Sequence, residues 1–141
     1  MSINCVRSLL EAAQQSHGNK TAIVLNNNSI TYSELFTRVN QVAYYLNELD
    51  LAKDSRVGIY STKGIEQVIA VLAILSTDYI LVPLTTLLKA EQVEYIINDC
   101  DIQCIITDKV KLESIEKINF SGHIISYETA SKGIASFEEI F

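Results

Sequence analysis

Short apolar runs alternate along the chain with segments whose apolar residues recur at three- and four-residue steps. The runs are rich in Ile and Val and mostly lack polar alternation, which is typical of strands buried on both faces of a parallel sheet. They are Thr21–Leu25, Arg56–Tyr60, Tyr79–Leu84, Cys104–Thr107 and His123–Ser126. Strand and helix in alternation predict an α/β fold, with a mostly parallel sheet flanked by helices and right-handed crossovers.

One predicted helix runs from about Ser33 to Leu49. Its apolar stripe consists of Leu35, Val39, Val42, Leu46 and Leu49. A capping box marks its start, because the Thr31 hydroxyl can accept the Glu34 backbone N–H while the Glu34 carboxylate reaches back to the Thr31 N–H. Upstream of it, Asn26-Asn27-Asn28 predicts a tight turn, since Asn tolerates positive φ. The turn joins Thr21–Leu25 to a short strand, Ser29–Thr31, as an N-terminal hairpin.

Other helices are predicted from shorter stripes. They are an opening helix with Val6, Leu9, Leu10 and Ala13, a helix from about Ile65 to Ser76, one from about Ala90 to Asp99, and a short one with Leu112, Ile115 and Ile118. The tail Ser131–Phe141 is ambiguous, because its apolar residues could form one more helical stripe. The helix from Ile65 is apolar nearly all round and calls for burial on most sides. Few segments of this chain remain to cover it, so we expect an exposed apolar patch larger than monomers usually show, through which the chain could self-associate.

Composition limits the class of protein. The chain has 141 residues, 48% of them hydrophobic, which is one domain's worth of globular material. A net charge of −6 with scattered Lys and Arg argues against nucleic acid. The longest apolar run, Val68–Leu75, is far shorter than the roughly 20 residues of a membrane span. Residues 1–7 show no secretory signal.

Three cysteines are an odd count, and Cys100 and Cys104 do not form a C-x-x-C pair. A reducing, cytoplasmic location therefore fits best, and no zinc or redox site is predicted. We interpret Asp99 and Asp101 as solvated loop residues that are too few for a metal cage. His17 and His123 have no nucleophile or paired carboxylate nearby, so a catalytic role is not indicated for either.

No glycine pattern supports a dinucleotide or Walker phosphate loop. The segment Ser61-Thr62-Lys63-Gly64 lies between a strand and a helix, where a phosphate could meet helix N-terminal amides. The simpler interpretation is an ordinary strand-to-helix turn with a Ser or Thr cap. The sequence thus predicts no catalytic residue and no metal ligand.

Five segments, in order, carry a family resemblance. They are Ile30–Leu35, Asp54–Ile59, Tyr79–Leu84, Ala90–Asp99 and Cys104–Asp108. Together they resemble the N-terminal region of the AMP-forming adenylating superfamily, which comprises acyl-CoA synthetases and peptide-synthetase adenylation domains. One departure is Ser76-Thr77-Asp78, where the family usually has Lys-Ala-Gly. That Gly serves a tight helix exit, and Asp78 can enter the left-handed region in its place. The stretch Pro83–Cys100 looks closer to acyl-CoA ligases.

The resemblance implies that residues 1–141 are a single partial domain, the N-terminal subdomain of an ATP-dependent acid–thiol ligase. The parent enzyme would use ATP, Mg²⁺ and CoA or a carrier protein to activate a carboxylic acid as an acyl-adenylate. The fragment would supply scaffold and be inactive alone, with the remainder of the enzyme as its partner. In some acyl-CoA synthetases, basic residues after the strand that corresponds to Cys104–Thr107 touch a CoA phosphate. Lys109 and Lys111 stand there, although two solvated lysines are the simpler interpretation.

Two alternatives remain at this point. The chain could be a complete small α/β protein that binds a ligand or pairs with a separate subunit carrying the ATP site. It could also be an unrelated flavodoxin-like module whose motif matches arise by chance. That module would have a complete sheet with a ligand crevice at its strand ends.

Overall fold

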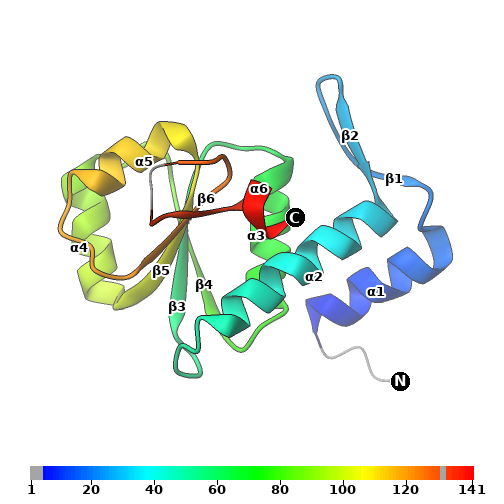
Figure 1. Ribbon diagram of the computed structural model, residues 1–141, viewed down its shortest axis with the longest axis horizontal. Coiled ribbons are helices and arrows are strands. Elements are labelled where there is room, and N and C mark those ends of the chain that lie inside the picture. Colours follow the sequence, from blue (N-terminus) through cyan, green and yellow to red (C-terminus); the bar gives the residue numbers. More distant parts are fainter. Residues whose placement is uncertain (1–4, 131–132) are drawn as a thin grey trace.

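The computed structural model of the chain, which describes residues 5–130 and 133–141, has three layers (Figure 1). A central sheet lies between two helices on one side and the remaining helices on the other, and a hairpin projects at one end. The elements are α1 (Val6–His17), β1 (Thr21–Leu25), β2 (Asn28–Thr31), α2 (Tyr32–Glu48), β3 (Arg56–Tyr60), α3 (Ile65–Leu75), β4 (Ile80–Leu84), α4 (Ala90–Cys100), β5 (Ile102–Thr107), α5 (Lys109–Glu116), β6 (His123–Ser126), β7 (Ala135–Ser136) and α6 (Phe137–Ile140).

The sheet has five strands in the order β4-β3-β5-β6-β7, and every neighbouring pair is parallel. The predicted α/β class and the separate β1–β2 hairpin are both confirmed. The chain leaves β3 first to one side, for β4, and then returns past β3 to β5 on the other side. The strand order therefore reverses between β3 and β5, where open α/β sheets characteristically place a crevice.

Two hydrophobic cores cover the two faces of the sheet. The core under α1, α2, α3 and α6 includes Val57, Ile59, Cys104, Ile106 and Ile125 from the strands. The core under α4 and α5 includes Tyr60, Leu84, Ile102 and Ile105. Successive strand residues alternate between these cores because side chains of a strand point to opposite faces. This double burial explains why the strands read as continuous apolar runs.

α3 is buried on one side only. Ile69, Ala70, Ala73 and Ile74 are completely buried against the sheet and α2. On the opposite side, Val68 is 36% exposed and Leu75 is 38% exposed. As expected from its composition, this helix has more apolar surface than the described part of the chain covers.

β4 corrects one prediction. The run Tyr79–Leu84 does contain a strand, but the prediction that it is buried on both faces is wrong. The same prediction is wrong for Thr21–Leu25, which forms β1 of the separate antiparallel hairpin, with Val24 67% exposed. β4 lies at the edge of the sheet, with Ile80 41% exposed and Pro83 also exposed. Pro lacks a backbone N–H and is confined within sheets to such edge positions, so Pro83 was the sequence signal for an edge.

The exit from α3 corrects a second expectation. Asp78 does not adopt a positive φ. Instead the Ser76 hydroxyl donates to the Leu72 carbonyl over 2.7 Å, and the Thr77 hydroxyl donates to the Ile74 carbonyl over 2.6 Å. These side chains satisfy carbonyls that the end of a helix leaves unpaired. Two hydroxyl residues thus replace the left-handed residue that the turn was expected to need.

The predicted hairpin and the start of α2 are confirmed. Asn26 has a φ of 55°, and β2 begins one residue earlier than expected, at Asn28. The capping box forms as predicted, with 3.2 Å from the Glu34 N–H to the Thr31 hydroxyl oxygen and 2.8 Å from the Thr31 N–H to the Glu34 carboxylate.

The ambiguous tail forms two short elements, the two-residue strand β7 and the one-turn helix α6. Phe137 at the start of α6 is buried and lies 5.0 Å from Tyr127, measured between ring centroids. Ser131 and Lys132 of the tail lie outside the described residues, as do residues 1–4 at the other end. Among the helices that the structure describes, none is long and apolar enough to cross a membrane.

We predict that Thr31→Ala lowers the free energy of unfolding by about 1 kcal/mol, because an N-cap hydroxyl satisfies a helix N–H that Ala cannot. Urea denaturation measures the loss. Thr37→Ala is the control: Thr37 is exposed inside α2, and its hydroxyl donates only to the Ser33 carbonyl, so no loss is expected there. An unchanged urea midpoint for Thr31→Ala would rule out the capping role.

Candidate functional site

The carboxyl ends of the parallel strands bring polar side chains together at one edge of the sheet. Ser61 and Thr62 follow β3, Asp108 follows β5, and Tyr127 follows β6. Because β3 and β5 flank the point where the strand order reverses, these residues lie where ligands enter folds of this kind. This edge is therefore the candidate site.

Asp108 is the ionisable centre of the site. The residue is 4% exposed, and its carboxylate accepts hydrogen bonds from the Thr62 N–H (2.7 Å), the Thr62 hydroxyl (2.6 Å) and the Lys111 N–H (2.8 Å). Burial disfavours the charged form, but these hydrogen bonds outweigh it and hold the pKa of Asp108 below its ordinary value. Asp108 thereby fixes the β3–α3 loop to the first turn of α5.

A second buried contact links β3 to β6. The hydroxyl oxygens of Ser61 and Tyr127 lie 2.8 Å apart, and the Gln67 amide nitrogen lies 3.4 Å from the Ser61 hydroxyl. Burial raises the pKa of Tyr127 above its ordinary value, so this phenol stays protonated. The interpretation of Ser61–Gly64 as a strand-to-helix turn is confirmed, but the expected Ser or Thr cap is wrong. α3 follows Gly64 with no side-chain cap, because Ser61 and Thr62 bond to other strands' loops instead.

A groove opens between the ends of β3 and β4, with a volume of about 370 Å³. It is lined by Ser61, Lys63, Gln67, Pro83, Leu84, Thr85 and Thr86. Hydroxyls, an amide and an ammonium group lie beside an apolar wall, so the groove can accept a small, partly polar ligand group. Its size is at the lower end of the range for small-molecule pockets.

The two lysines predicted to contact a phosphate are placed differently from one another. The Lys111 ammonium donates to the Thr86 carbonyl over 3.0 Å and lies 5.4 Å from the centre of the Tyr60 ring. Lys109 is exposed, and its backbone N–H donates to Glu128 over 2.9 Å. Residues two apart on a helix do not share a face. Lys111 therefore anchors the loop after β4, while Lys109 is open to solvent.

Sequence reasoning missed the role of Asp108, although a signal was present. Asp is a favoured N-cap residue, and Asp108 stands directly after a strand and one residue before α5. A search for N-caps would have found the Lys111 contact. Nothing local in the sequence signals the Thr62 contact, which joins residues 46 positions apart.

The remaining candidates lie apart from this edge or are exposed. His17, His123, Asp99 and Asp101 are all exposed. Cys104 is buried, which raises the pKa of its thiol to about 12. In residues 5–130 and 133–141, no group of three or more His, Cys, Asp or Glu could hold a metal ion.

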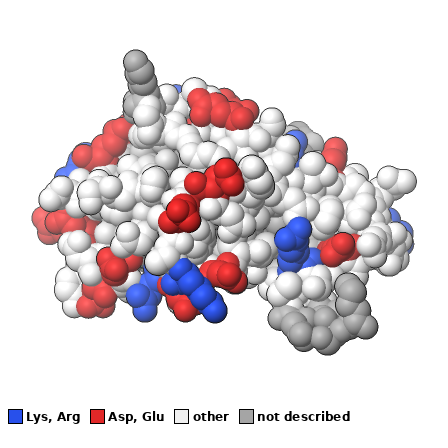
Figure 2. Space-filling view, turned by 60° about the horizontal axis from the view of Figure 1, so that its bottom comes forward, with Lys and Arg blue, Asp and Glu red and all other residues white. Residues whose placement is uncertain are grey.

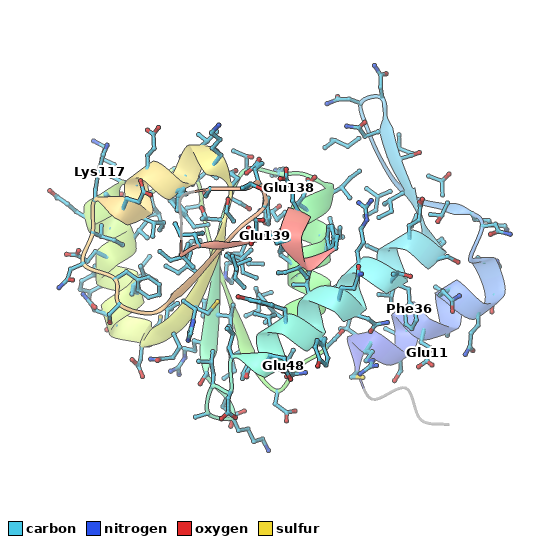
Figure 3. The ribbon with its side chains drawn as sticks, viewed as in Figure 1. Glu11, Phe36, Glu48, Lys117, Glu138 and Glu139 are labelled. Carbon is cyan, nitrogen blue, oxygen red and sulfur yellow. The ribbon has the colours of Figure 1, made fainter. Side chains whose placement is uncertain are left out.

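The face drawn in Figure 2 shows no large patch of one charge among the described residues. On the face drawn in Figure 2, acidic side chains are scattered, and the basic ones lie next to acidic ones. Figure 3 places Lys117 at the outer end of α5 and Glu11 on α1, both on the periphery. Phe36 of α2 lies beside α1 in the same view, consistent with its packing against the core.

Comparison with known proteins defines the family. The family model of the AMP-binding enzymes matches residues 10–138. Gramicidin S synthase 1 of Brevibacillus brevis is 32% identical over 123 residues, which is 87% of this chain and 11% of that protein. Tyrocidine synthase 1 of Brevibacillus parabrevis is 30% identical over 120 residues, again 11% of that protein. The chain belongs to the AMP-binding, adenylate-forming enzyme family.

Solved structures agree with this assignment. The anthranilate CoA ligase AuaEII, in complex with anthranoyl-AMP, has a TM-score of 0.88 and 27% identity over 96% of this chain. A benzoate CoA ligase from Burkholderia xenovorans LB400 shares the fold, with a TM-score of 0.86 and 19% identity. This chain covers 27% and 28% of those two ligases, so it spans about a quarter of their length. The β-strand order is thus that of a family member rather than of an unrelated module.

We predict that Asp108→Asn lowers the free energy of unfolding at neutral pH by about 1–3 kcal/mol, because an amide cannot accept all three of the N–H and O–H groups that donate to the carboxylate. The folded-state pKa is depressed, so the carboxylate's contribution is complete above the ordinary Asp pKa of about 3.9 and is lost as the pH falls through the folded-state pKa. Urea titrations from neutral to acidic pH should show the two proteins converging in acid.

Asp99→Asn is the matched control for this experiment, because Asp99 is an exposed carboxylate on α4. We expect its urea midpoint to stay within experimental error of the wild type at every pH. An Asp108→Asn protein as stable as the wild type at neutral pH would contradict the bridging role of Asp108.

Proposed function

We propose that this chain is the N-terminal scaffold portion of an ATP-dependent, AMP-forming acid–thiol ligase. The observation that carries the proposal is the family match over residues 10–138, together with the structural similarity to a CoA ligase along nearly the whole chain. The parent enzyme would join ATP and a carboxylic acid to form an acyl-adenylate and pyrophosphate. A thiol would then take the acyl group.

The contribution of these residues to that reaction is architectural. The site at the sheet edge holds one carboxylate, Asp108, and its oxygens already accept three hydrogen bonds from the chain. An adenylating enzyme also needs groups that hold the phosphates of ATP and its Mg²⁺, and residues elsewhere in the enzyme would supply them. Residues 1–141 then form a single partial domain, and the rest of the ligase is its partner. That partner could be the same polypeptide or a separate subunit.

Lys109 is one candidate contact for an anionic acceptor. It lies exposed at the first turn of α5, where its charge adds to the positive end of the helix dipole. A CoA phosphate could bind there, while Lys111, on another face of α5, holds the Thr86 loop in place. We therefore propose that the parent enzyme is an acyl-CoA ligase. The alternative is that a carrier protein, rather than CoA, accepts the acyl group. The peptide synthetases among the relatives favour that alternative.

The isolated chain is predicted to release no pyrophosphate from ATP with any carboxylic acid, because the phosphate-binding groups lie outside it. A coupled pyrophosphate assay measures this directly. Pyrophosphate release by residues 1–141 alone would show that they hold a working active site and would overturn the scaffold role.

A chimaera with AuaEII tests whether these residues can serve as the N-terminal portion of a ligase. In AuaEII, the segment that this chain matches is replaced by residues 1–141, and anthranilate-dependent pyrophosphate release is measured. We expect activity with anthranilate, because in this family the acid pocket is formed by later residues. A chimaera that folds cooperatively but forms no adenylate would contradict the proposal.

In an active chimaera, Lys109→Ala is expected to raise the KM for CoA roughly three- to tenfold, which corresponds to the loss of one exposed ionic contact of about 1 kcal/mol. The rate of adenylate formation should not change, because CoA enters afterwards. Lys117→Ala is the control, since Lys117 lies at the far end of α5 (Figure 3). Equal KM values for CoA in the Lys109 and Lys117 variants would show that Lys109 does not contact CoA.

A further inference from the structure

The hydrogen bond between the Ser61 and Tyr127 hydroxyls has a direction, which their surroundings decide. The two oxygens lie 2.8 Å apart. Within residues 5–130 and 133–141, the Tyr127 hydroxyl has no other hydrogen-bond partner, and Tyr127 is 7% exposed. If Ser61 donated, the phenol hydrogen would be buried and unpaired, which costs free energy. A phenol is also a more acidic donor than an aliphatic hydroxyl. Tyr127 therefore donates and Ser61 accepts.

This direction leaves the Ser61 hydrogen available to the groove between the ends of β3 and β4. The Gln67 amide donates to the same Ser61 oxygen over 3.4 Å, so both lone pairs of that oxygen are used. Among the described residues, the Ser61 hydrogen then has no acceptor. Ser61 is only 2% exposed, yet it lines the groove. A ligand atom that lies against Ser61 should therefore be a hydrogen-bond acceptor.

The rest of the lining defines the kind of acceptor. Lys63 adds an ammonium group, and no Asp or Glu is among the lining residues. Thr85 and Thr86 add hydroxyls, while Pro83 and Leu84 form an apolar wall. One positive charge and several donors beside an apolar wall suit an anionic oxygen pair on a short hydrocarbon chain. A carboxylate of a short aliphatic acid has both parts.

The wall of the groove that follows β4 is held in place before any ligand binds. The Lys111 ammonium donates to the Thr86 carbonyl over 3.0 Å, and the Tyr60 hydroxyl donates to the Leu88 carbonyl over 2.7 Å. On the opposite wall, the Gln67 amide also donates to the Ser61 carbonyl over 3.4 Å. A groove whose walls are already ordered loses less conformational entropy when a ligand binds.

We propose that this groove is a binding site for the carboxylate of a short aliphatic acid. The Ser61 hydroxyl and the Lys63 ammonium donate to the carboxylate oxygens, and the hydrocarbon chain lies against Pro83 and Leu84. The proposal goes beyond the proposed function, because this binding requires neither ATP nor polypeptide outside residues 1–141. The net charge of −6 disfavours non-specific binding of anions, so saturable binding would report on the groove itself.

The test titrates hexanoate into the isotope-labelled chain and follows the backbone amide signals by NMR. We expect saturation with a Kd on the order of 1–20 mM, as the ligand efficiency of a small ligand allows. The largest shifts should fall on Lys63, Gln67, Thr85 and Thr86. Hexanamide has a similar shape without the charge and should bind about three- to tenfold more weakly. Equal binding of the two compounds, or no saturable shift at these residues, would overturn the proposal.

A lysine variant tests the ionic contact. Lys63→Ala should raise the Kd for hexanoate about three- to tenfold, because Lys63 is exposed and its ion pair is screened by water. Lys117→Ala is the matched control, since Lys117 lies at the outer end of α5 (Figure 3), and its Kd should equal that of the wild type. A Kd that Lys63→Ala leaves unchanged would exclude the ammonium from the site.

Two further variants test the Ser61 hydroxyl. Tyr127→Phe should change the Kd less than about twofold, because Ser61 already directs its hydrogen to the ligand. Binding that tightens severalfold would show that Ser61 donates to Tyr127 in the wild type, and would overturn the assigned direction. The double variant Ser61→Ala/Tyr127→Phe removes both hydroxyls and so leaves no buried phenol unpaired. Relative to Tyr127→Phe, its Kd should rise about three- to tenfold, and an equal Kd would exclude Ser61.

Urea midpoints confirm that each variant is folded at the temperature of the titration. The outcome is separate from that of the proposed function, which pyrophosphate release by the chimaera tests. A chain that binds hexanoate while the chimaera is inactive keeps the groove and rejects the function. An active chimaera whose groove binds no hexanoate keeps the function and rejects the groove.

Discussion

Parallel strands cannot be joined by a tight turn, and the architecture of this chain follows from the crossovers that they require. The crossover from β3 to β4 runs through α3 on one face of the sheet. The crossovers from β4 to β5 and from β5 to β6 run through α4 and α5 on the other face. Because β4 and β5 lie on opposite sides of β3, the loops after β3 and β5 diverge, and polar residues meet at these strand ends. Because the chain returns to the other side of β3 after β4, β4 pairs with β3 alone and lies at the edge of the sheet.

The polar loops are held by buried hydrogen bonds rather than by a ligand. Asp108 ties the β3–α3 loop to α5, and Ser61 meets Tyr127 from β6. Each group is buried, so each would be costly to leave unpaired. These contacts give the sheet edge a fixed shape.

The same crossovers explain why the molecule combines a well-packed interior with a helix, α3, whose outer side is partly exposed. The side of α3 that faces the sheet is completely buried, while Val68 and Leu75 on the other side are exposed. A helix that is apolar all round is stable only where further structure covers it. The relatives that the chain matches are longer: it covers 11% of gramicidin S synthase 1 and 27% of AuaEII.

The sequence by itself determined the local elements, because they depend on neighbouring residues. The period of apolar positions located the strands and helices, the Thr31–Glu34 capping box marked the start of α2, and ordered motifs identified the family. Only the tertiary structure decided the order of the strands, how α3 ends, and what Ser61 and Thr62 bond to. Those outcomes depend on contacts between residues far apart in the chain, such as Thr62 with Asp108. The strand order that creates these contacts is not encoded in any local pattern.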